Sequence, residues 1–235
     1  MSKRLAVMLL AVLPVAAVAA PESYTLDSYH TFPNFTVDHL GLSTIHGRFE
    51  KTTGKVTLDR AAKTGSIDIA IPTATVTTGD GDKGSRPRSR DEHLRTADFF
   101  NVAEFPQMTY KATKISFNGD NPSSIDGDLT LLGVTKPLTL TIARFKCNPA
   151  SGNNKEKCGG DATGKFKRSD FGMKTGIPSV GDEVTMIIGF EGFKVSGANT
   201  GVKGDVAKTI PFLRSHPFEI LPQRLFHEVS LLCSS

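Results

Sequence analysis

The sequence predicts an all-β fold, an eight-stranded antiparallel barrel with one short flanking helix. Short segments such as 35–40 and 138–142 alternate apolar and polar residues, which is the period of a strand with one buried face. Turn residues separate these segments at short spacing, and only one segment carries helix signals. About eight strands can be counted, roughly the number at which a closed barrel can just hold one ligand.

The expected strands follow one another along the chain without an internal repeat. Gly54 is expected to split the second strand with a bulge or hairpin turn. Pro72 limits the third strand, and residues 118–122 form a strong turn after the fourth. The predicted strands are 28–40, 48–59, 66–71, 107–117, 125–132, 136–146, 160–168 and 183–193.

The one predicted helix covers residues 89–100. Ser89 is a candidate N-cap, and Asp91 and Glu92 place negative charge in the first turn, where the helix dipole favours it. Pro106 prevents any continuation. We expect this helix to cap or flank the barrel.

Alternation with a period of two also predicts which side chains point inward. These side chains could line a hollow lumen or fill an ordinary core, and the sequence alone does not separate the two. The predicted inward residues are Phe35, Val37, His39, Phe49, Val56, Leu58, Ile67, Ile69, Ile71, Met108, Tyr110, Leu129, Leu131, Leu138, Leu140, Ile142, Val184, Met186 and Ile188.

The N-terminus has the features of a signal peptide over residues 1–20. Lys3 and Arg4 precede an apolar run over 5–19, which ends in small residues before Pro21. The run is short for a membrane span of ~20 residues. We therefore expect a secreted protein, periplasmic in a bacterium, whose leader is cleaved.

The rest of the chain is expected to form one barrel domain over 21–194, followed by an extension over 195–235. The extension contains three prolines and an odd cysteine, Cys233. Prolines at this spacing exclude a long helix. We expect a disordered extension or a translated out-of-frame end.

Cys147 and Cys158 flank a turn-rich segment, which favours a disulfide between two strands in an oxidising compartment. Two free thiols are the alternative. A metal site is not expected, because neither cysteine has a C-x-x-C partner or a nearby histidine.

Charge and motifs argue against several functional classes. The formal net charge of +4 falls close to +2 without the leader, which gives no warrant for nucleic-acid binding. The basic cluster over 83–90 is read as a solvated loop or as a cationic rim for an anionic head group. His30, His39, His46 and His93 lack metal-ligand spacing, and no G-x-S-x-G motif is present.

Four stretches, taken in order, resemble the YceI-like family of lipocalin-like, polyisoprenoid-binding periplasmic proteins. The resemblance implies a barrel enclosing a polyprenyl phosphate or an isoprenoid quinone, with no cofactor and no enzymatic activity. The stretches are 26–30 with 37–49, 91–102 with 105–106, 127–137, and 168–173 with 180–184.

At the rim of such a barrel we expect His93, Arg168 and Asp170 to orient a head group or close the tube. A structural ion pair between Arg168 and Asp170 is the plainer interpretation. The expected partners are the isoprenoid lipid and, transiently, a membrane or lipid donor, and a tube open at one end could pair as a homodimer.

Two other functions stay open at this point. One is an enzyme acting on a small hydrophobic substrate, with His39, His93 or Asp170 as acid–base groups. The other is a non-catalytic stress- or adhesion-related module whose barrel interior is filled.

Overall fold

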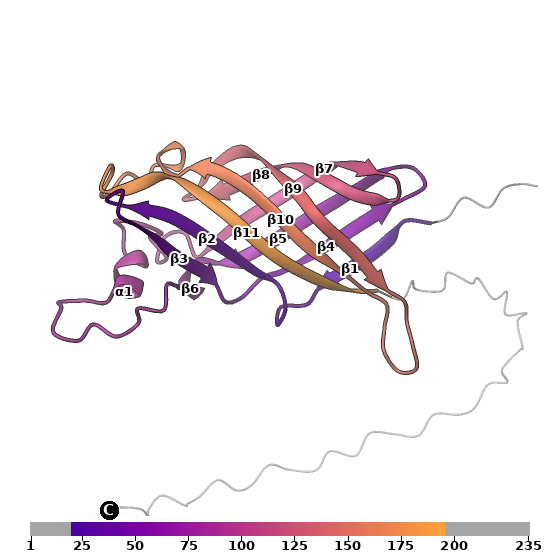
Figure 1. The fold of residues 1–235 in the computed structure, drawn as a ribbon, viewed down its shortest axis with the longest axis horizontal. Coiled ribbons are helices and arrows are strands. Elements are labelled where there is room, and N and C mark those ends of the chain that lie inside the picture. Colours follow the sequence, from indigo (N-terminus) through magenta and orange to yellow (C-terminus); the bar gives the residue numbers. More distant parts are fainter. Residues whose placement is uncertain (1–19, 196–235) are drawn as a thin grey trace, which may run out of the picture. The chain divides into compact units, whose positions relative to one another are not determined.

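The computed structural model describes residues 20–195, so all but the last residue of the predicted leader and all but the first residue of the C-terminal extension lie outside the described residues. Eight antiparallel strands close into a ring in which β1 pairs with both β4 and β11 (Figure 1). This confirms the predicted fold class. The ring order is β1 (Glu22–Leu26), β4 (Thr53–Asp59), β5 (Thr64–Pro72), β7 (Gln107–Asn118), β8 (Asn121–Leu131), β9 (Val134–Asn148), β10 (Lys157–Lys167) and β11 (Val180–Lys194).

Three shorter strands extend the wall at the end near the helix: β2 (Phe32–His39), β3 (Ser43–Phe49) and β6 (Val76–Thr77). The long strand β11 pairs with β1 near its C-terminal end and with β2 over the rest of its length. The first predicted strand, 28–40, corresponds to β2, and β1 precedes it across the segment 27–31 as a strand that was not predicted.

The predicted break at Gly54 is wrong. The chain breaks at 50–52, between β3 and β4, while Gly54 lies inside β4 opposite Ile69. A Cβ at Gly54 would lie 2.5 Å from the carbonyl oxygen of Asp68. Glycine is required there for the close approach of two strands and not for a turn.

The helix α1 (Arg90–Leu94) is shorter than predicted. The Ser89 hydroxyl accepts from the Glu92 N–H, and the Glu92 carboxylate accepts from the Ser89 N–H, which completes a capping box. After Leu94 the chain continues as turns, interrupted at Asn101, whose φ is 43°. No helix within residues 20–195 is long and apolar enough to cross a bilayer.

Register shifts interrupt the alternation of several long strands, and two of them fall on β7 and β9. The β7–β8 register shifts between Ala112 and Lys114, and the β10–β9 register shifts between Asp161 and Ala162. Because an extra residue reverses which face the following side chains occupy, inward positions change from even to odd numbers beyond each bulge.

A candidate ligand cavity in the barrel

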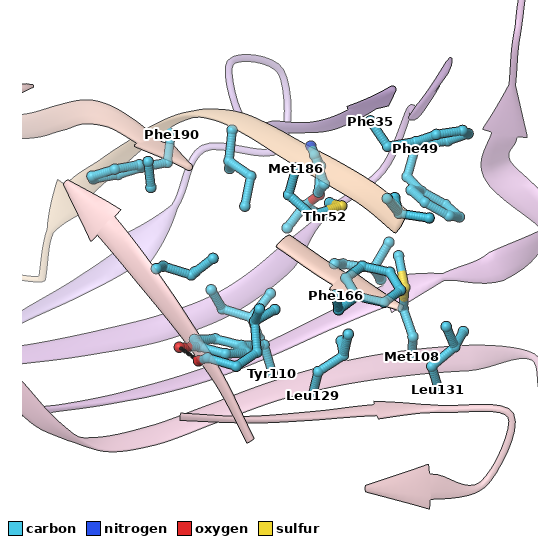
Figure 2. A pocket seen from close by; sticks show the side chains of 18 of the residues that line it. Phe35, Phe49, Thr52, Met108, Tyr110, Leu129, Leu131, Phe166, Met186 and Phe190 are labelled. Atoms are coloured by element: carbon cyan, nitrogen blue, oxygen red, sulfur yellow. Dashed lines mark hydrogen bonds between the residues drawn. The ribbon is translucent and has the colours of Figure 1, made fainter. Parts of the chain in front are cut away.

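A cavity runs through the barrel interior (Figure 2). Its volume is about 190 Å³.

All but one of the predicted inward residues line this cavity. Phe35, Met186 and Met108 lie among the labelled side chains around it in Figure 2, with Leu129 and Leu131. Whether these side chains contact a ligand stays a prediction.

His39 is the exception, and its assignment to the lumen is wrong. It shares a face with the lining residue Val37 but is the last residue of β2 and only half-buried. It pairs with Val180 where the β11 register is irregular, just before the turn to β3. The period of two holds on this strand, but the lining contributed by β2 ends at Val37.

Several lining residues were missed by the sequence analysis. Ile115 and Phe145 follow the two bulges, so simple alternation assigns them to the outside. Phe100 enters from the segment after α1 and packs edge-on against Phe49, with 5.3 Å between ring centroids. The others missed as lining are Leu26, Thr31, Pro33, Thr52, Leu94, Phe99, Pro122, Ile125, Ala162, Phe166, Met173, Val180 and Phe190.

The cavity presents only apolar surface, because its few polar lining residues turn their polar atoms into the wall. The Tyr110 hydroxyl lies 2.9 Å from the carbonyl oxygen of Leu138 and 3.2 Å from that of Ile125, and burial raises its pKa. The Thr31 hydroxyl donates to the Glu191 carbonyl and accepts from the Glu191 N–H.

Thr52 differs from these residues. It is 1% exposed, and its hydroxyl oxygen has no hydrogen-bond partner within the described residues. Thr52 lies in the break between β3 and β4, where the wall is not continuously paired. A buried hydroxyl without a partner is destabilising, because its desolvation is not compensated.

Arg168 lines the cavity but its guanidinium serves the chain itself. It donates to the carbonyl oxygens of Met173, Thr175, Val180 and Gly181 at 2.8–3.2 Å. Burial lowers its pKa, and the nearby Asp182 acts in the opposite direction. Arg168 therefore clamps the segment 173–181 against the end of the barrel, and a head-group role for it stays a prediction.

The structure does not bring the three predicted rim residues together. His93 lies 2.8 Å from Asp98, and its ring packs edge-on against Phe99. Asp170 is exposed in the short 3₁₀ helix η2 (Arg168–Phe171) and forms no salt bridge with Arg168 within the described residues. The predicted Arg168–Asp170 ion pair is thus absent there, because the Arg168 side chain turns inward to carbonyl groups.

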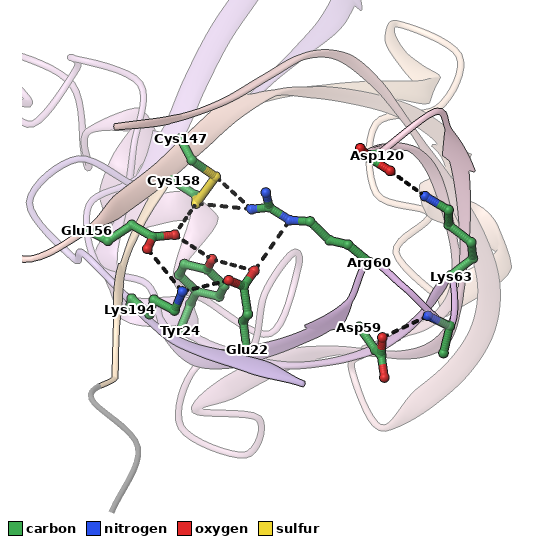
Figure 3. Close-up of polar contacts among 11 residues, drawn as sticks. Glu22, Tyr24, Asp59, Arg60, Lys63, Asp120, Cys147, Glu156, Cys158 and Lys194 are labelled. Carbon is green, nitrogen blue, oxygen red and sulfur yellow. Dashed lines mark hydrogen bonds and ion pairs between the residues drawn. A yellow bond between two sulfur atoms is a disulfide. The ribbon is translucent and has the colours of Figure 1, made fainter. Parts of the chain in front are cut away.

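At the other end of the barrel, Cys147 and Cys158 form a disulfide, as predicted. They face each other directly in the β9–β10 register. The guanidinium of Arg60 reaches them from the β4–β5 turn (Figure 3) and also lies 5.8 Å from the ring of the lining residue Phe145. The disulfide is therefore next to the cavity wall.

A charged cluster surrounds this end. Lys194 donates to Glu22 at 2.6 Å and to Glu156 at 3.0 Å, and the Tyr24 hydroxyl lies 3.1 Å from both carboxylates (Figure 3). Burial and the two carboxylates raise the pKa of Tyr24 to about 12. Burial acts to raise the pKa of Glu22, but hydrogen bonds from Lys194 and Tyr24 outweigh it and lower that pKa.

Within residues 20–195, two groups of side chains have the spacing of metal ligands, and the side chains of each already contact other groups of the protein. In the first, Cys147 and Cys158 are bonded to each other. In the second, the Lys157 ammonium contacts Glu191 and lies 3.0 Å from Asp27, and the His30 ring lies 2.8 Å from Asp27. An internal cation thus takes the position that a metal would need.

Fold and cavity together define an antiparallel β-barrel protein with a long apolar interior. Residues 24–192 match the family model described as the YceI-like domain, and the chain belongs to this family. Protein YceI of Escherichia coli is 37% identical over 178 residues, which cover 75% of this chain and 88% of that protein. Protein YceI of Salmonella arizonae is 36% identical over the same shares.

Solved structures show the same fold. The Campylobacter jejuni YceI protein superposes with a TM-score of 0.54 and 29% identity, over 68% of this chain and 90% of that one. Burkholderia cenocepacia BcnA superposes with a TM-score of 0.55 and 24% identity, over 71% of this chain and 98% of that one. A polyisoprenoid-binding domain from Saccharophagus degradans superposes with a TM-score of 0.51 and 15% identity, over 73% of this chain and 98% of that one.

Proposed function

We propose that this protein is a non-catalytic carrier or storage protein that holds an isoprenoid lipid, a polyprenyl phosphate or an isoprenoid quinone, in its barrel. The observation that carries the proposal is a closed barrel around a narrow cavity with an entirely apolar surface. The polyisoprenoid-binding domain that shares the fold supports the same ligand class.

The energetics favour a long hydrocarbon chain. Each CH₂ group moved from water into such a cavity contributes ~0.8 kcal/mol, so a chain of several isoprene units gains enough to be held without polar contacts. A charged or strongly polar head group inside the cavity would lose its hydration and find no accessible partner. The chain therefore occupies the bore, and the head group stays at the rim or outside.

The compartment that fits this ligand is the periplasm, to which the leader predicted over residues 1–20 would direct the chain before it is cleaved. The Cys147–Cys158 disulfide suits an oxidising compartment. A prenyl lipid does not cross an aqueous compartment unescorted, and a barrel that covers the chain would make the crossing feasible.

Native mass spectrometry and organic extraction of the protein purified from its own host test the proposal. We expect a bound lipid whose mass matches a prenyl chain and which is lost on denaturation. Recovery of empty protein that also takes up no prenyl lipid from detergent would overturn it.

A further inference from the structure

Three apolar side chains lie exposed on two neighbouring loops near the α1 end of the barrel. Leu40 is 53% exposed, Leu42 83% and Ile177 37%. The loops are joined by a hydrogen bond in which the Leu40 N–H donates to the Ser179 carbonyl at 2.7 Å. We call Leu40, Leu42 and Ile177 the apolar tip.

Leu40 is an unfavourable residue for its own backbone. Its φ is 60°, that of Gly41 is 67°, and the Leu42 N–H donates to the His39 carbonyl at 3.0 Å. Turns with two successive left-handed residues favour Asn, Asp or Gly at the first position, and a bulky side chain there is strained. Leu40 is thus strained in its backbone and half-exposed in its side chain, so neither feature stabilises the folded state.

A second turn of the same kind provides a comparison. Leu132 and Gly133, between β8 and β9, have φ angles of 51° and 72°. Leu132 packs against the hydrophobic core, so burial offsets its backbone strain. Leu40 has no such compensation in the described part of the chain.

The apolar tip adjoins the cavity. Val37 and Val180 line the cavity, and His39 pairs with Val180 one residue before Leu40. Arg168, which also lines the cavity, holds the segment that carries Ile177 through the Thr175 and Val180 carbonyls. Leu40 and Ile177 therefore each lie three residues along the chain from a side chain that lines the cavity.

We propose that the apolar tip inserts into the lipid bilayer when the barrel loads or unloads its ligand, an inference that rests on the proposed carrier function. Three side chains on two loops are too few for a stable protein partner, which needs roughly 800 Å² on each side. They suit shallow insertion, in which each buried aliphatic group contributes directly to membrane affinity. Lys174, which is exposed and whose carbonyl accepts from the Ile177 N–H, adds a positive charge beside this tip that suits anionic lipid phosphates.

The test compares two variants of the full mature chain. Leu40→Asn with Leu42→Ser removes most of the apolar tip, and the matched control Ile187→Ser removes an exposed aliphatic side chain from the outer face of β11, 46% exposed. Binding is measured by flotation with vesicles of phosphatidylethanolamine and phosphatidylglycerol. Transfer of a fluorescent prenyl alcohol between vesicles is measured in parallel, and its uptake from detergent micelles reports on the cavity alone.

We expect vesicle binding and transfer to fall about tenfold or more in the double variant and to stay unchanged in the control. Micellar uptake should be equal in all three proteins, and the melting temperature should not fall, because Asn suits the left-handed position. The membrane role would be overturned if wild type and double variant bound vesicles equally, or if wild type did not bind them. In either case, uptake of the probe from micelles would still support the carrier function. Failure of wild type to take up the probe from micelles would instead overturn the carrier function.

Discussion

The Arg60 guanidinium lies 2.9 Å from the Cys147 sulfur, which ties the β4–β5 turn to the strand pair β9–β10 on another part of the ring (Figure 3). Arg60 also lies 3.4 Å from Glu22 on β1. Three separate regions of the wall thus meet at the disulfide. Because Arg60 lies over the ring of the lining residue Phe145, this junction adjoins the cavity wall.

Removing the disulfide should weaken the barrel. The bond closes a segment with a sequence separation of 11, for which the loop-entropy relation gives ~2–3 kcal/mol. We expect Cys147→Ser with Cys158→Ser to lower the free energy of unfolding by about that amount in urea titrations. Wild type unfolded in dithiothreitol should match the double variant. Equal stability of oxidised and reduced protein would contradict the expectation.

Glu22 should make the stability depend on pH. Its pKa is lowered in the fold from an ordinary value of 4.5, so its contribution is present above that value and is lost as the pH falls through the folded-state pKa. We expect Glu22→Gln to cost ~1–2 kcal/mol at pH 7 and progressively less below pH 4.5. Thermal melts over this range measure the difference.

The control for that experiment is Glu50→Gln, which removes the exposed Arg48–Glu50 pair. Exposed pairs contribute little, ~0–1 kcal/mol, so this variant should follow the wild-type pH profile. If the free energy of unfolding of Glu22→Gln ran parallel to that of wild type at every pH, the charged cluster around Glu22 would not couple stability to protonation.

Two buried threonines should respond in opposite ways to the same substitution. Thr52→Val replaces a hydroxyl without a partner by a methyl group and should raise the free energy of unfolding by ~1 kcal/mol. Thr31→Val removes a hydroxyl bonded to both Glu191 backbone groups and should lower it by ~1–2 kcal/mol. Urea titrations of both variants measure this, and a loss in Thr52→Val equal to that in Thr31→Val would contradict the assignment.

The sequence predicts most of this barrel because alternation is a local property of the chain. Strands β5 and β11 follow the expected rows closely, as Ile67 and Met186 show. The errors arise where geometry depends on the rest of the fold. The bulges that turn Ile115 and Phe145 inward leave no trace in the alternation itself. His39 shares the inward face of its strand but does not line the cavity. The point at which a strand stops lining the cavity depends on the strands and loops beside it, which the alternation does not reveal.

The polar part of the site was harder to predict than the apolar part. The sequence analysis assigned Arg168 to the rim, but a sequence does not show that its guanidinium will be bonded to carbonyl groups of its own chain. The unpartnered Thr52 was missed, since it differs from other threonines only through its surroundings.

The most direct test of a ligand-filled bore is to obstruct it. Ala162 on β10 is 3% exposed and lines the cavity, whereas its neighbour Thr163 points to solvent. Ala162→Phe should direct an aromatic ring into the bore and reduce uptake of a prenyl alcohol from micelles at least tenfold. Thr163→Phe adds the same ring outside the barrel and should leave uptake unchanged.

Stability separates obstruction from misfolding. Forcing bulk into a well-packed core costs ~1–3 kcal/mol, whereas a ring that enters empty space loses less and gains burial. We therefore expect Ala162→Phe to melt within a few degrees of wild type while losing ligand. A strongly destabilised Ala162→Phe would mean that the interior near β10 is already filled, and undiminished uptake by a stable variant would mean that the lipid lies elsewhere.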